Sequence, residues 1–134
     1  MQILEYKINR YNFKKEFISE GVLTIKDGGV ATTFIYSDST ITESATELYH
    51  PLTTLASLRI LLEEKHRSLI NCMGCRIDTA FRLTGGYGTY IIALDHSKPV
   101  SQNDSVIIFE PTDDISKLCT VSEHEAAYDK WCEH

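Results

Sequence analysis

Two cysteines, Cys72 and Cys75, have the CxxC spacing of thioredoxin-like redox pairs and of half a zinc site. A redox pair needs a helix N-terminus to lower a thiol pKa, whereas this pair follows residues 68–72, which have the composition of a strand. A zinc site needs two more ligands close together, but the remaining candidates are scattered: Cys119, Cys132 and His134. We expect four reduced cysteines that pack as small buried apolar side chains, with zinc binding and redox chemistry as the alternatives.

Other residue types with catalytic potential lack the partners that catalysis requires. The glycine-rich residues 83–90 contain no Gly-Lys-Ser/Thr and precede a strand-like segment, which indicates a tight turn rather than a phosphate-binding loop. No HExxH and no Gly-x-Ser-x-Gly pattern occurs, and Glu123-His124-Glu125 beside Asp129 is typical of a solvated acidic helix face. The sequence therefore predicts no enzymatic activity, no cofactor and no metal site.

Arg76, Asp78 and Arg82 form a second candidate group. At these spacings they share one face of a continuous strand. The arginine and the aspartate either pair with each other or face a ligand together with Tyr87 or Tyr90. The second possibility describes a small ligand-binding or enzymatic domain.

The net charge of −6 is concentrated near the end of the sequence. Residues 1–108 contain 12 acidic and 11 basic residues, whereas residues 109–134 contain seven acidic residues and two lysines, a net charge of −5. Such a segment repels nucleic acids and membrane surfaces and attracts a basic protein. We expect its acidic and aromatic side chains to bind that partner: Asp113, Asp114, Glu123, Glu125, Tyr128, Asp129 and Trp131.

Residue patterns predict the elements that position these groups. Residues 2–8, 21–26 and 29–36 have strand composition, and Asp27-Gly28-Gly29 predicts a hairpin between the last two. Ser44 and Glu47 match a helix capping box. Leucines at spacings of three and four after Pro51 predict an amphipathic helix to about Lys65.

The second half of the chain has three further strand-like segments, residues 68–72, 87–94 and 106–109, and a short helix over Val121–Trp131. We expect one α+β domain over residues 1–134, with a mostly antiparallel sheet packed against one main helix and a short C-terminal helix. The sequence has neither a signal-peptide core nor an apolar run of about 18 residues, so cytoplasmic residence is expected.

Several of these segments together resemble a known family. His50-Pro51, the helix with Leu58-Arg59 and Leu62-Glu63, Asn71–Asp78, Gly85-Gly86 with Tyr90, and Val106–Phe109 carry the likeness, which covers roughly residues 50–110. They resemble small immunity proteins of bacterial polymorphic toxin and contact-dependent growth-inhibition systems. The resemblance implies a protein without enzymatic activity that binds and neutralises a cognate toxin, often a basic nuclease.

Overall fold

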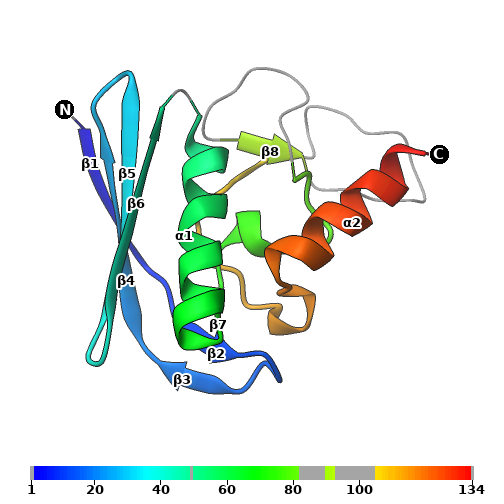
Figure 1. Ribbon diagram of the computed structural model, residues 1–134, viewed down its shortest axis with the longest axis horizontal. Coiled ribbons are helices and arrows are strands. Elements are labelled where there is room, and N and C mark those ends of the chain that lie inside the picture. Colours follow the sequence, from blue (N-terminus) through cyan, green and yellow to red (C-terminus); the bar gives the residue numbers. More distant parts are fainter. Residues whose placement is uncertain (1, 49, 82–89, 93–104, 134) are drawn as a thin grey trace.

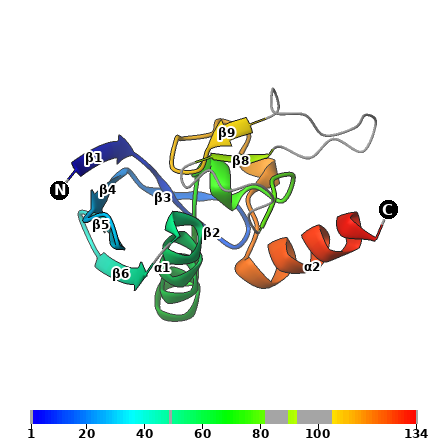
Figure 2. The ribbon, with the colours of Figure 1, turned by 90° about the horizontal axis from the view of Figure 1, so that it is seen from above.

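The computed structural model describes residues 2–48, 50–81, 90–92 and 105–133. It confirms the predicted α+β class, with antiparallel sheets, a main helix packed on a sheet and a short C-terminal helix. The main helix lies between the largest sheet and the C-terminal helix (Figures 1 and 2). The predicted Arg82, Tyr87 and Gly85-Gly86 lie outside the described residues.

The largest sheet has four antiparallel strands in the order β1-β4-β5-β6. Their bounds are Gln2–Lys7, Gly21–Asp27, Ala31–Asp38 and Thr42–Leu48. The predicted hairpin joins β4 to β5, where Gly29 takes a φ of 94° and donates its N–H to Asp27 Oδ1 at 2.9 Å. Inward-facing residues alternate along both strands, which produces the buried set Leu23, Ile25, Phe34 and Tyr36.

The capping box predicted at Ser44 and Glu47 is wrong, because both residues belong to β6. The alternation along this strand explains the outcome. Glu43, Ala45 and Glu47 are half-buried on the helix side, and the residues between them are exposed. Glu47 Oε1 accepts a hydrogen bond from Ser57 Oγ, and Glu43 Oε2 lies 2.7 Å from His66 Nε2, so both carboxylates bind the helix rather than cap one.

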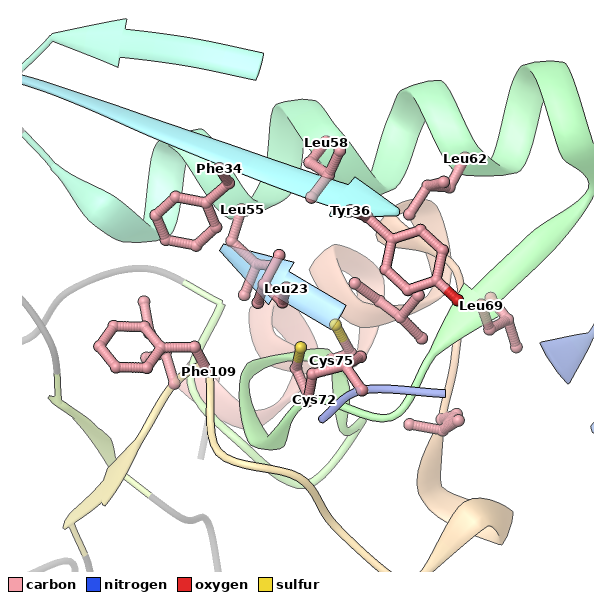
Figure 3. Close-up of a cluster of buried hydrophobic side chains, with 14 of the residues drawn as sticks. Leu23, Phe34, Tyr36, Leu55, Leu58, Leu62, Leu69, Cys72, Cys75 and Phe109 are labelled. Carbon is pink, nitrogen blue, oxygen red and sulfur yellow. The ribbon is translucent and has the colours of Figure 1, made fainter. Parts of the chain in front are cut away.

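Helix α1 spans Pro51–His66, as its leucine spacing predicted. His50 caps its first turn, because Nδ1 accepts a hydrogen bond from the Leu52 N–H at 3.0 Å. Arg67 ends the helix in the left-handed conformation with a φ of 48°. The buried face carries four leucines of the core: Leu52, Leu55, Leu58 and Leu62. Figure 3 shows Leu55, Leu58 and Leu62 beside Phe34 and Tyr36 of the sheet.

A second antiparallel sheet, in the order β3-β2-β7, lies beside the first. Its strands are Arg10–Asn12, Phe17–Ser19 and Ser68–Ile70, for β2, β3 and β7 respectively. Strand β7 confirms part of the predicted segment 68–72, whereas β2 and β3 were not predicted. They form a hairpin inserted in the sequence between β1 and β4, and their sheet is separate from the four-stranded one, where a single sheet was expected.

The remaining elements surround this body. They are the short helix η1 (Met73–Cys75), the strand pair β8 (Tyr90–Ile92) and β9 (Ser105–Ile107), the short helix η3 (Ile115–Lys117) and helix α2 (Val121–Cys132). Helix α2 confirms the predicted C-terminal helix. The predicted strand 106–109 ends early, because Ile108 and Phe109 lie in the turn after β9 and are buried there. Phe109 packs against Tyr6 and Phe34.

Candidate functional site: the acidic surface and its groove

Asp113 and Asp114 lie in an exposed loop that precedes η3. The loop is tied to the end of β7 by Asn71, whose carbonyl oxygen accepts the Thr112 N–H at 2.8 Å and whose Nδ2 donates to Thr112 O at 3.0 Å. The side chain of Asp114 accepts a hydrogen bond from Ser116 Oγ at 2.6 Å. The other carboxylate oxygen of Asp114 lies 3.8 Å from Arg76 Nη2, so Asp114 is partly paired, whereas Asp113 is exposed on the same loop.

The other predicted binding residues belong to α2, where they have three different roles. Glu123 closes a capping box, because its Oε1 accepts the Thr120 N–H at 2.9 Å while Thr120 Oγ1 accepts the Glu123 N–H. Glu125 and Asp129 are exposed and lie one turn apart. Tyr128 is buried and stacks on the half-buried ring of Trp131. Tyr128 thus contributes to packing, not to the exposed surface.

A groove of about 560 Å³ runs beside Asp113. Its charged lining includes Glu20 and Lys7 as well as Asp113, contributed by three separate parts of the chain. Asp38 lies at its base, where burial alone would raise the carboxyl pKa, but hydrogen bonds from Arg10 and from two backbone amides lower it to about 2. Since Arg10 neutralises Asp38, the accessible charge of the groove comes from one lysine and two carboxylates.

Glu20 and Lys7 were not predicted as site residues. Neither belongs to a motif, and neither lies near Asp113 in the sequence. We call Asp113, Asp114 and Glu20 the acidic surface, whereas Glu125 and Asp129 belong to α2.

Arg76 and Asp78 form an ion pair, one of the two outcomes that the sequence left open. Arg76 Nε and Nη2 donate to the two carboxylate oxygens of Asp78 at 2.8 and 2.7 Å, and Nη1 donates to Thr112 Oγ1 at 2.9 Å. Burial would raise the pKa of Asp78, yet the hydrogen bonds and charge of Arg76 lower it. The expectation that they share a strand face is wrong: Arg76 makes an isolated bridge with Leu118, and Asp78 lies in the turn that follows.

The CxxC motif lies in the core. Cys72 precedes η1, and Cys75 is its last residue. Both are buried, and their side chains lie among the aliphatic residues of the core (Figure 3). Cys119 is also buried, and its thiol donates to Cys75 O at 3.5 Å. Cys132 is exposed, so the expectation of burial is wrong for this residue, which lies at the last position of α2. Among the described residues, no three His, Cys, Asp or Glu side chains are grouped to hold a metal ion.

Sequence comparison finds no protein family and no curated protein that matches this chain. Within the described residues, no helix has both the length and the apolar composition to cross a bilayer.

Proposed function

We propose that this chain is an immunity protein that neutralises a cognate basic toxin by binding it through the acidic surface. The observation that supports this most directly is the grouping of Asp113 with Glu20 in the groove, next to the exposed Asp114. With two carboxylates and one lysine, the groove has a net charge of −1 and favours a lysine or arginine side chain from a partner. The toxin as partner comes from the family resemblance described above.

The location of the strongly buried titratable groups also favours binding over catalysis. Within the described residues, His124 and the thiols of Cys72 and Cys75 lie inside the core, away from the groove. The carboxylate at the base of the groove is held ionised by Arg10. The groove therefore offers fixed charge for recognition.

Growth rescue tests the function. The gene immediately upstream should encode a toxin, and its toxin domain should stop growth when expressed alone and should permit growth when this chain is co-expressed. Purified chain should bind the same domain with 1:1 stoichiometry by calorimetry. Absence of rescue and of binding would overturn the proposal.

Paired charge reversals test the surface. Asp113→Lys with Asp114→Lys should slow association by about tenfold at low salt and by less at high salt, because exposed charges steer the encounter and are screened. Glu5→Lys with Glu64→Lys makes the same change in net charge at two exposed positions on β1 and α1. If both double variants slow association equally, only net charge matters and the acidic surface is not the binding site.

A further inference from the structure

The groove contains an unpaired positive charge as well as unpaired negative charges. Lys7 lines it together with Glu20 and Asp113. Within the described residues, none of these three side chains makes a hydrogen bond or an ion pair, so neither carboxylate neutralises the lysine. Asp38 differs from them, because Arg10 pairs with it at the base of the groove. The groove therefore presents one cation and two anions to a ligand.

A side-chain amide lies in the same lining. Asn9 is half-buried, and in the described part of the chain its side chain makes no hydrogen bond. An amide offers two N–H donors and an oxygen acceptor. Since Asn9 follows Lys7 by two residues and lines the same groove, its amide can donate to a carboxylate that the lysine binds. This part of the groove is suited to an anionic group.

The backbone around the groove is fixed by hydrogen bonds between its walls. The Ile8 N–H donates to Gly21 O at 3.1 Å. Asn71 Oδ1 accepts the Asn9 N–H at 2.8 Å, while the Asn71 carbonyl oxygen accepts the Thr112 N–H at 2.8 Å. Each charged residue of the lining directly precedes or follows one of these bonded residues in the sequence. The charges are therefore attached to an ordered backbone, which lowers the entropic cost of binding a small ligand.

We propose that the groove binds a free basic α-amino acid, arginine or lysine. Its volume of about 560 Å³ lies in the range of small-molecule sites. The ligand carboxylate meets Lys7 and Asn9, and the α-ammonium and the side-chain cation meet Glu20 and Asp113. Such a ligand has two cations and one anion, the inverse of the lining, whereas a single basic side chain leaves the lysine unpaired. This inference goes beyond the proposed function and does not depend on it, because no toxin takes part.

Four small molecules test the ligand chemistry by NMR titration of the wild-type chain. L-arginine should bind with a Kd on the order of 1 mM, as expected for a ligand of about this size. Agmatine lacks the carboxylate, L-citrulline lacks the side-chain charge and N-acetyl-L-arginine lacks the α-ammonium, so each should bind about tenfold more weakly. Equal binding of all four, or no saturable binding of L-arginine, would overturn the proposal. N-acetyl-L-arginine binding at least as tightly as L-arginine would assign the groove to a C-terminal arginine of a protein and would overturn it too.

Conservative variants test the location of the site. Lys7→Gln should weaken L-arginine binding about tenfold without weakening agmatine binding, because agmatine has no carboxylate for the lysine to meet. Glu20→Gln with Asp113→Asn should weaken the binding of both ligands by about tenfold or more. Lys130→Gln and Glu64→Gln are the matched controls, since both residues are exposed and lie outside the groove, and their Kd should stay within about twofold of wild type. Equal losses in the groove variants and the controls would show that the ligand binds elsewhere.

The outcomes separate this inference from the proposed function. L-arginine binding by a chain that neither binds nor neutralises the toxin domain encoded upstream would support the amino-acid site and overturn the proposed function. Neutralisation of that toxin by a chain that does not bind L-arginine would overturn the amino-acid site alone.

Discussion

Arg59 and His124 meet in the core, where Nη1 of the arginine lies 2.9 Å from Nδ1 of the histidine. A guanidinium can only donate, so Nδ1 accepts and the imidazole proton is on Nε2, which donates to Thr79 O at 2.8 Å. Arg59 Nη2 also donates to Cys119 O at 3.0 Å. One side chain of α1 thereby fixes the position and tautomer of a buried residue of α2.

The neutral state of His124 makes stability depend on pH. Burial, and then the charge of Arg59, lower its pKa from 6.5 to about 4. The unfolded chain therefore binds a proton at higher pH than the folded chain. The contribution of neutral His124 to the free energy of unfolding is fully present above pH 6.5 and is lost as the pH falls toward 4. We expect a loss of roughly 2–3 kcal/mol over this interval from this residue. Urea unfolding at pH 7.5 and 4.5 measures it.

The matched variant for this measurement is His124→Gln, which keeps hydrogen-bonding capacity without a titrating ring. It should be less stable than wild type at pH 7.5, and the difference should narrow at pH 4.5. Equal losses in both proteins would assign the pH dependence to other groups.

Replacing Arg59 should separate the importance of its charge from that of its forked geometry. Arg59→Met leaves Cys119 O and His124 Nδ1 without their donor, which should cost about 2–4 kcal/mol. Arg59→Lys keeps the charge but cannot donate to both acceptors in the same plane, so we expect a loss of similar size. Chemical denaturation measures both, with Arg67→Lys at the exposed end of α1 as the control. Wild-type stability in Arg59→Lys would show that charge alone is sufficient.

Gly21 should be intolerant of any side chain. A Cβ atom at this position would lie 2.6 Å from Cζ of Tyr36, whose ring is fully buried and whose hydroxyl donates to Asp38. We expect Gly21→Ala to destabilise the protein by about 1–3 kcal/mol through this overlap. Gly28→Ala is the control, because its nearest contact would be at 3.4 Å, and it should change stability far less. Equal thermal shifts in the two variants would contradict this explanation.

Thiol titration should distinguish the four cysteines. Cys132 is exposed, whereas the others are buried, and burial raises the pKa of Cys119 to about 12. Since thiolates are the reactive form, a thiol reagent should modify about one cysteine per native chain and all four after denaturation. Cys132→Ser should remove the fast phase. Rapid modification of Cys75 in the native protein, detected by mass spectrometry, would contradict the packing described here.

Elements with a local signal were predictable from sequence. Leucine spacing after Pro51 predicts α1, and Asp27-Gly28-Gly29 predicts the β4–β5 hairpin, because these patterns depend on neighbouring residues. Strands β2 and β3 have three residues each and pair locally with each other, but β2 also pairs with β7, far along the chain. No short window of sequence contains that interaction.

In the candidate site, too, features with a local signal were predictable from sequence and features that depend on long-range contacts were not. The exposure of Asp113 and Asp114 agrees with their position in a polar, acidic segment. The grouping of Asp113 with Glu20 and Lys7 depends on the approach of three separate segments. Tyr128 was expected on the binding surface but is buried, because an aromatic residue on a polar helix can pack into the core as readily as it can face solvent.

The pairing of β2 with β7 has a kinetic consequence. Arg10 hydrogen-bonds to Ser68, 58 residues away, so the second sheet closes a long loop, whereas β4, β5 and β6 pair with their immediate neighbours. Since long loops close at a greater entropic cost, we expect the β4–β6 meander to form early and the β2–β3 hairpin to dock late. The β2–β3 hairpin is then the first of the two to open from the native state, and its amides should exchange with solvent faster than those of β4 and β5.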